Sequence, residues 1–337
     1  MKICSLLPSG TEILFALGIG DQILGITDLC DYPKETLHKR IVCRSKIDVN
    51  ELSSEQVDEA MHKLLESGES PFELDSDWLE DHAPDVILTQ DLCYFCEIDA
   101  STVHEHVENI PDMPDVVILN PKNLSEIFDS ILQVGSACRQ PSKAKTLVNG
   151  LKQRVQNIED KFPDDLKRPK VFSLEGINPL VIGGHWIPDL LQRAGGQQTL
   201  FSAGGPAQRI DWQEVVGYAP EKLFIDLCSS DLNRHQREIP WLFNQPDWWD
   251  IPAVKSGEVY MIDHVYFSRP GPRIVKGIEI TAELTHPDLF HGMVPENTVL
   301  KLDPYKALSV PISNIASCFH PYSHPSCWNP TSRSINH

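Results

Sequence analysis

The sequence lacks any apolar run close to the eighteen or so residues that a membrane-spanning helix requires, so we expect no membrane span. Positive charge is also scarce, because 29 Lys and Arg stand against 48 Asp and Glu, a formal net charge of −19. Nucleic acids and anionic membranes bind clustered Lys and Arg side chains. This charge balance therefore argues against both kinds of partner.

The first residues lack the features of a secretory signal. Segment 1–7 (MKICSLL) leads directly into an expected strand, Pro8 interrupts the apolar run, and Glu12 follows. We therefore expect a cytoplasmic protein. In a reducing compartment its nine cysteines are free thiols or metal ligands rather than disulfides.

Several enzyme motifs are missing as well. The chain has no Gly-x-Ser-x-Gly elbow, no phosphate-loop lysine motif and no Gly-x-Gly-x-x-Gly, and nothing in it pairs a nucleophile with a base. Glu12 follows Ser9 closely, so we interpret it as part of a helix cap rather than as a catalytic acid. We favour a ligand-binding protein over an enzyme, and the enzyme question stays open.

The most regular apolar pattern lies in segment 142–162. One helical stripe there consists of Leu147, Leu151, Val155, Ile158 and Phe162. At about 1.5 Å per residue the helix is roughly 30 Å long, the width of a small domain. Because similar α/β patterns lie on both sides of it, we interpret this helix as a rigid connection between two lobes.

Strands and helices alternate in both lobes. The expected strands are 2–7, 23–27, 41–42, 85–89 and 116–119, then 170–174, 222–227 and 259–262. This alternation predicts α/β lobes of Rossmann-like type with parallel sheets. We assign 1–140 to the N-terminal lobe, 141–163 to the linking helix and 164–290 to the C-terminal lobe. Pro, Ser, Asn and His dominate 291–337, which we expect to be an irregular extension.

One stretch occurs twice. Segment 83–93 (APDVILTQDLC) matches segment 219–228 (APEKLFIDLC) with one deletion. Ala-Pro followed by an acidic residue is a common joint between a helix and a strand. The length of the match nevertheless favours two lobes that repeat one another.

Three motifs resemble a known family. LLPSxTEILxALG at 6–18, CDYP at 30–33, and Trp248 followed by IPAV at 251–254 are similar to solute-binding proteins for cobalamin and iron-siderophores, which serve ABC importers. The resemblance implies a periplasmic-binding-protein-like fold of the helical-backbone type, with the ligand between the lobes.

A leaderless subgroup identified as cobalamin-binding is more similar still. It shares QDLCxxC at 90–96, GHWIP at 184–188 and YFSRPGPR at 266–273. The resemblance implies a cytosolic binding protein for cobalamin, a related corrinoid or another metal chelate. It leaves any protein partner unknown.

Loops at the carboxyl ends of parallel strands line ligand crevices. This rule gathers a set of candidate ligand-binding residues: Tyr32, Gln90, Asp91, Tyr94, Glu175, His185, Trp186, Tyr266, Phe267, Arg269 and Arg273. Its aromatic members suit a planar conjugated ligand, although some of them can equally belong to the core.

Arg269 and Arg273 flank a Pro-Gly-Pro turn that opens a helix. Free amides at a helix N-terminus together with an arginine form an anion site, which suits a phosphate or carboxylate on the ligand. Alternatively, Arg273 pairs with a carboxylate of the protein.

The cysteines suggest a rival function. Cys93 and Cys96 form a CxxC motif, and Cys30 and Cys228 follow two other strands. Together with His185 they can ligate cobalt axially, or hold a zinc ion or an iron–sulfur cluster. That arrangement defines a metalloenzyme or metal-binding protein using the same cleft. Alternatively, the thiols are buried small hydrophobic groups.

Overall fold

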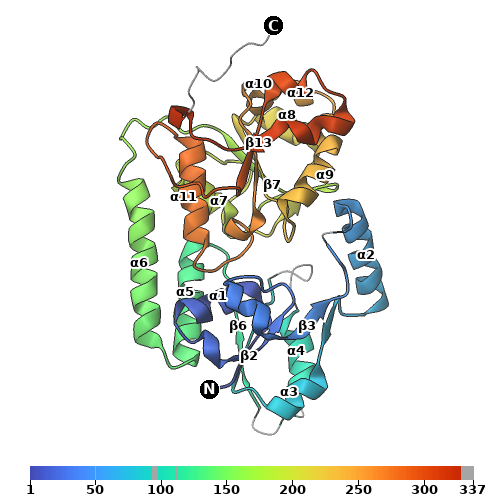
Figure 1. The fold of residues 1–337 in the computed structure, drawn as a ribbon, viewed down its shortest axis with the longest axis vertical. Helices are drawn as coiled ribbons and strands as arrows, with labels where there is room; N and C mark the ends of the chain where they lie inside the picture. Colours follow the sequence, from blue (N-terminus) through green and yellow to red (C-terminus); the bar gives the residue numbers. More distant parts are fainter. Residues whose placement is uncertain (50, 93–97, 109, 111–112, 328–337) are drawn as a thin grey trace.

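The computed structural model describes residues 1–49, 51–92, 98–108, 110 and 113–327. Two α/β lobes lie one above the other and are joined along one side by helix α6 (Pro141–Glu159) (Figure 1). The predicted fold class is therefore confirmed. The helix begins at Pro141, because proline is favoured at the first helical position, and it ends at Glu159, so Phe162 of the predicted stripe lies beyond the helix. None of the helices in the described ranges is long and apolar enough to cross a membrane.

The N-terminal lobe has a six-stranded sheet of order β4-β3-β2-β1-β5-β6. Its strands are β1 (Ile3–Ser5), β2 (Ile23–Thr27), β3 (Arg40–Ser45), β4 (Phe72–Leu74), β5 (Val86–Thr89) and β6 (Asp115–Ile118). Its helices are α1 (Pro8–Ala16), α2 (Ser54–Ser67), α3 (Ser76–His82), α4 (Ala100–Val107) and α5 (Leu124–Ala137). Neighbouring strands are parallel except that β4 runs antiparallel to β3. Helices α1 and α5 share one core with the sheet, and α3 and α4 share another.

The C-terminal lobe has a seven-stranded sheet of order β13-β12-β11-β10-β7-β8-β9. Its strands are β7 (Val171–Ile177), β8 (Leu180–Ile182), β9 (Gln208–Arg209), β10 (Lys222–Ile225), β11 (Val259–Ile262), β12 (Val299–Leu302) and β13 (Phe319–Pro321). Its helices are α7 (Ile187–Arg193), α8 (Trp212–Tyr218), α9 (Leu232–Phe243), α10 (Pro252–Ser256), α11 (Ile274–Thr285) and α12 (Pro304–Ala307). The central strands β7, β10 and β11 pair in parallel, and the strands toward both edges of this sheet pair antiparallel. The N-terminal sheet has an antiparallel strand only at its β4 edge.

The segment after residue 290 differs from the expected irregular extension. Strand β12 pairs antiparallel with β11, and β13 pairs with β12. Phe319 is 5% exposed, and its ring lies 6.5 Å from that of Phe243 in α9. Residues 299–321 therefore form part of the C-terminal lobe. These strands have only four and three residues, too few to produce a readable alternation of hydrophobic and polar positions.

The repeated sequence stretch has the same local structure in both lobes. In the first lobe the backbone N–H of Lys2 donates to the Asp85 carboxylate at 2.6 Å, and the Asp85 N–H donates back to the Lys2 carbonyl at 2.8 Å. In the second lobe Lys170 and Glu221 make the same two bonds at 2.9 and 2.8 Å. We call each pair a clasp. The match between the two clasps supports lobes that repeat one another.

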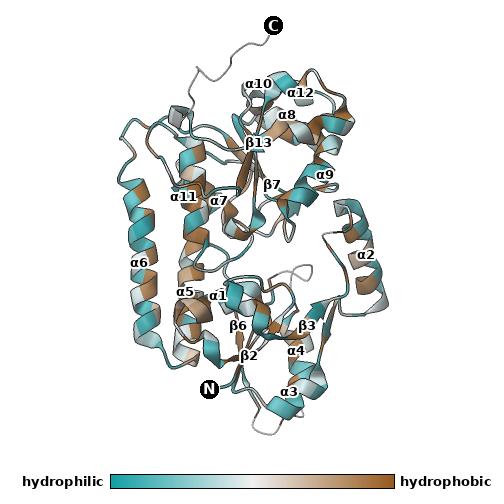
Figure 2. Cartoon of the chain, viewed as in Figure 1, coloured by the Kyte–Doolittle hydropathy of each residue, from teal (hydrophilic) through white to brown (hydrophobic). Residues whose placement is uncertain are grey.

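Helix α6 contacts both lobes. It packs against α5 of the N-terminal lobe and against α11 and α7 of the C-terminal lobe. Its buried residues are Ala144, Val148, Leu151, Val155 and Ile158. The strands of both sheets are largely hydrophobic, whereas α6 carries both kinds of residue (Figure 2). An amphipathic helix of this kind holds the lobes at a fixed separation on the α6 side.

Candidate functional site

The carboxyl ends of the parallel strands face one another across the boundary between the lobes. A cavity of about 280 Å³ lies there, lined by Asp28 and Asp31 after β2 and by Cys228, His264 and Arg269 from the C-terminal lobe, among others. A smaller inner cavity of about 80 Å³ shares the lining residues Cys228 and Ser268 with it. We call the two together the cleft cavity.

Four of the predicted ligand-binding residues line the inner part of the cleft cavity: Gln90 from the N-terminal lobe and Glu175, His185 and Trp186 from the C-terminal lobe. Trp186 is 5% exposed, and its indole N–H donates to the Phe267 carbonyl at 2.7 Å. The imidazole of His185 lies against this indole, with the ring centroids 5.7 Å apart. The indole is thereby held in one orientation at the wall of the cavity.

Two carboxyl groups lie side by side in this wall, because β7 and β10 are neighbouring parallel strands. Asp226 is fully buried and accepts a hydrogen bond from the Ser173 hydroxyl at 2.7 Å. Burial raises the pKa of Asp226 well above its usual value, and the adjacent Glu175 raises it further. Burial also raises the pKa of Glu175 to about 8, with a smaller contribution from Cys228. The pair therefore retains protons at neutral pH.

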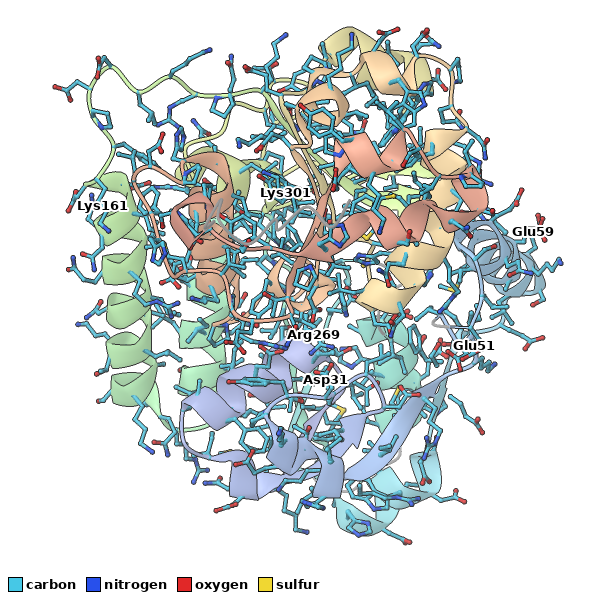
Figure 3. The ribbon with its side chains drawn as sticks, turned by 45° about the horizontal axis from the view of Figure 1, so that its top comes forward. Asp31, Glu51, Glu59, Lys161, Arg269 and Lys301 are labelled. Carbon is cyan, nitrogen blue, oxygen red and sulfur yellow. The ribbon has the colours of Figure 1, made fainter. Side chains whose placement is uncertain are left out.

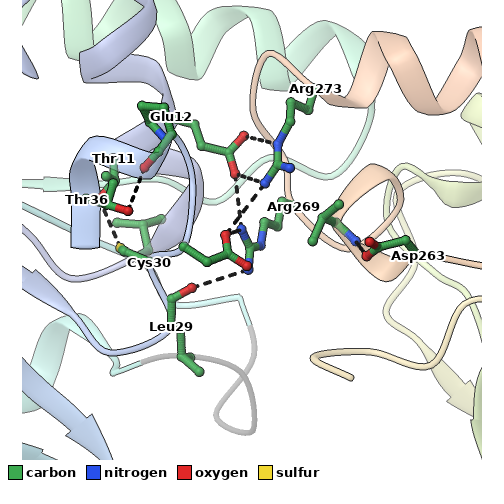
Figure 4. Close-up of polar contacts among 12 residues, drawn as sticks. Thr11, Glu12, Leu29, Cys30, Thr36, Asp263, Arg269 and Arg273 are labelled. Atoms are coloured by element: carbon green, nitrogen blue, oxygen red, sulfur yellow. Dashed lines mark hydrogen bonds and ion pairs between the residues drawn. The ribbon is translucent and has the colours of Figure 1, made fainter. Parts of the chain in front are cut away.

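Arg269 and Arg273 bind carboxylates of the other lobe (Figure 4). The Arg273 guanidinium donates to both oxygens of Glu12 at 2.9 and 2.5 Å. Arg269 donates to the Asp31 carboxylate and, at 3.4 Å, to Glu12. We call these four residues the interlobe ion cluster. Of the two roles considered for Arg273, the structure shows pairing within the protein, although the partner lies in the opposite lobe.

The interpretation of Glu12 as a helix cap is wrong. Helix α1 begins at Pro8, its N-cap residue is Leu7, and no side chain caps it. Glu12 lies in the second turn, its side chain is only 2% exposed, and it accepts from both arginines. No local sequence pattern indicates this role, because its partners follow about 260 residues later.

The predicted aromatic residues lie in different places. Tyr32 and Tyr266 line a third cavity, of about 610 Å³, together with Leu147 and Leu151 of α6. The Arg273 guanidinium covers the Tyr32 ring at 4.2 Å. Phe267 is fully buried, so in this structure its ring belongs to the core. The interlobe ion cluster borders both compartments, since Arg269 lines the cleft cavity and Glu12 and Arg273 line the third one.

The remaining candidates have mainly structural contacts or fall outside the described residues. The Asp91 carboxylate accepts a hydrogen bond from the backbone N–H of Ala100 at 2.8 Å, so its contact is with the start of α4. Tyr94, Cys93 and Cys96 lie outside the described residues.

The two described candidate cysteines differ in burial. Cys30 is buried, with its sulfur 3.1 Å from the Thr11 hydroxyl, whereas Cys228 is partly exposed in the cleft cavity. Within the part of the chain that the structure describes, no group of three or more His, Cys, Asp and Glu side chains can hold a metal ion. The predicted zinc or iron–sulfur arrangement includes Cys93 and Cys96, so the metalloenzyme alternative stays a prediction.

The fold and the interlobe cavity are those of a two-lobe binding protein. The chain belongs to the periplasmic binding protein family, whose model matches residues 3–266. It is 25% identical over 299 residues to an uncharacterised ABC transporter substrate-binding lipoprotein of Bacillus subtilis, covering 86% of this chain and 81% of the relative. It is 20% identical over 285 residues to the vitamin B12-binding protein of Vibrio vulnificus, covering 84% and 89%.

Solved structures have the same fold. A periplasmic heme-binding protein from Pseudomonas aeruginosa superimposes with a TM-score of 0.65 at 15% identity, covering 86% of this chain and 93% of that one. The periplasmic vitamin B12-binding protein of Vibrio cholerae gives a TM-score of 0.61 at 17% identity, covering 85% and 96%. At these identities the similarity shows the fold alone.

Proposed function

We propose that this protein binds cobalamin, or a related corrinoid or metal chelate, between its lobes without catalysing a reaction. Family membership and the vitamin B12-binding relatives support this proposal. The observation that carries it is the cleft cavity, where Gln90 of one lobe faces Glu175, His185 and Trp186 of the other. Polar groups that converge beside an aromatic wall, at the carboxyl ends of parallel strands, are typical of a ligand site.

The contacts available in the cleft favour hydrogen bonds and ring packing over ion pairs. Both arginines are already paired with Glu12 and Asp31. Glu175, which retains its proton at neutral pH, supplies an O–H donor for amide or carboxyl oxygens on the edge of the ligand. Trp186 and His185 supply flat surfaces for the ring.

The cleft cavity must widen to admit such a ligand. Its larger part, about 280 Å³, is at the lower end of the range of small-molecule sites, and a corrin ring with its side chains is larger. The structure therefore corresponds to a closed form of the protein under this proposal. Its cytoplasmic location remains a prediction that cell fractionation tests.

A fluorescence titration tests the proposal. Cyanocobalamin added to the reduced protein is expected to quench tryptophan emission saturably at micromolar or lower concentration. Trp186→Phe is expected to lose a large share of the quenching. The control Trp212→Phe alters an indole in the other core of the C-terminal lobe and keeps it. Equilibrium dialysis measures binding independently of optical absorption by the corrinoid, and absence of retained cyanocobalamin would exclude cobalamin as the ligand.

A further inference from the structure

Helix α2 belongs to the N-terminal lobe but lies beside the C-terminal lobe, on the side of the molecule away from α6 (Figure 1). It follows β3 near the edge of the sheet, and a capping box of Ser53 and Gln56 fixes its first turn. Glu51, shortly before the helix, and Glu59 on its outward side both lie at the outer edge of the molecule (Figure 3).

The first turn of α2 is bonded to α9. The backbone N–H of Ser54 donates to the Glu238 carboxylate at 3.1 Å, so this carboxylate lies at the positive end of the helix dipole. Arg234 donates to the same carboxylate at 2.8 Å and to the Ser54 hydroxyl at 3.2 Å. The side chains of Arg234 and Glu238 are 5% and 8% exposed, so this contact excludes water.

A second contact follows one turn later. Arg209 of β9 donates to both carboxylate oxygens of Asp58 at 2.7 and 2.9 Å. This ion pair is more exposed, with the Arg209 side chain 60% accessible. Exposed ion pairs are screened by solvent and contribute little to stability, so this contact is easier to break than the buried interlobe ion cluster.

These contacts close one edge of the cleft cavity. Val49, just before α2, and Asp231, the N-cap of α9, both line the cavity. Asp231 accepts a hydrogen bond from the backbone N–H of Arg234, and Arg234 in turn donates to Ser54. The cavity wall at Asp231 is therefore connected directly to the contact between α2 and α9. The cavity thus lies between the interlobe ion cluster on one side and the α2 contacts on the other.

We propose that α2 is a gate: it separates from α9 and β9 to open the cleft cavity, while α6 and the interlobe ion cluster hold the lobes in place. This proposal depends on the proposed function in one respect: the gate would admit the ligand that binds in the cleft cavity. The opening itself concerns access to the cavity and is measurable in the ligand-free protein.

Cys228 is the probe, because its partly exposed side chain lines both parts of the cleft cavity. We compare its labelling by a bulky maleimide with its labelling by the small reagent methyl methanethiosulfonate, using peptide mass spectrometry. Asp58→Arg replaces the ion pair with repulsion between two cations. This change is expected to raise the bulky-reagent rate several-fold with little effect on the small-reagent rate. The charge swap Asp58→Arg with Arg209→Asp restores the wild-type ratio.

Two controls separate a gate from general loosening. Glu59→Arg makes the same charge change on the outward side of α2, where the side chain is 63% exposed, and is expected to leave the ratio unchanged. Cys138, buried in the N-terminal lobe, reports global opening. A parallel rise at Cys138, or an unchanged ratio in Asp58→Arg, overturns the gate. Neither result depends on cyanocobalamin, so failure of the gate and failure of the proposed ligand are distinguishable.

Discussion

Arg273 and Glu12 lie in different lobes and form a two-bonded ion pair across the boundary between them, at 2.9 and 2.5 Å. The Glu12 side chain is 2% exposed, so its charge has lost nearly all contact with water. A carboxylate in such a place is stable only when hydrogen-bonded cations replace its hydration. The pair therefore fixes how the two lobes meet near α6.

Glu12→Ala is expected to lower the free energy of unfolding by about 3–5 kcal/mol, because it leaves two arginines without this buried partner. Denaturant unfolding measures the change. The control Glu35→Ala removes an exposed carboxylate at the neighbouring third cavity and is expected to cost less than about 0.5 kcal/mol. Equal effects for the two variants would show that the interlobe ion cluster does not stabilise the fold.

The Glu175 carboxyl is expected to contribute a loss of thermal stability as the pH rises from about 5 to 8, opposite in sign to the contribution of the histidines whose pKa burial lowers (His185, His235, His264 and His286). Burial raises the pKa of Glu175 from 4.5 to about 8, so in this range the folded state binds more protons than the unfolded state. The stabilisation is complete below the unfolded pKa and is lost as the pH passes the folded pKa. Asp226 acts in the same direction.

Glu175→Gln is expected to remove this contribution, because the amide does not titrate, so the variant loses less stability than the wild type between pH 5 and 8. The matched control Glu66→Gln, at an exposed position of α2, keeps the wild-type slope. Melting temperatures recorded across the range provide the measurement. Equal slopes for the wild type and Glu175→Gln would mean that Glu175 is ionised in the folded protein at neutral pH.

Cys30 is expected to resist alkylation in the folded protein. Burial raises the pKa of its thiol to about 12, and the lowering influence of Thr11 and Arg269 does not offset this. Iodoacetamide at mildly alkaline pH should label Cys228 before Cys30, as read by peptide mass spectrometry, and denaturant should remove the difference. Rapid labelling of native Cys30 would indicate a reactive thiol and revive a chemical role for it.

Phe319→Ala is expected to destabilise the protein by about 3–5 kcal/mol, since the ring is 5% exposed and packs near Phe243. Tyr305→Ala nearby is the control, because its side chain is 86% exposed and its removal should change stability by less than about 0.5 kcal/mol. Denaturant unfolding compares them. A negligible effect of Phe319→Ala would mean that residues 299–321 do not belong to the cooperative core.

Much of the fold follows from the sequence because hydrophobic periodicity is local. Strands Ile23–Thr27 and Val259–Ile262 have the expected bounds. Helix α9 was not predicted, because Pro240 lies inside it and the charged Arg234 and the imidazole of His235 occupy buried positions. Tertiary packing stabilises this helix although its sequence lacks a regular apolar stripe, so hydrophobic periodicity alone does not predict it.

The candidate site was only partly predictable for a related reason. The ends of parallel strands converge, so Gln90 and Glu175 could be placed at one cleft from their positions in the chain. The partners of Arg269 and Arg273 could not, because Glu12 and Arg273 are 261 positions apart. Likewise, only the folded chain shows that Asp58 of α2 meets Arg209.

The two clasps, Lys2 with Asp85 and Lys170 with Glu221, each close within their own lobe. Each lobe thus has its own pair of hydrogen bonds at the start of its first strand. The polypeptide passes from one part to the other through residues 160–170, between α6 and β7. A protease that nicks this connection would leave the buried face of α6 seated on α11 and the interlobe ion cluster intact. The two fragments should therefore migrate together on size-exclusion chromatography, as a heterodimer made from what began as one polypeptide.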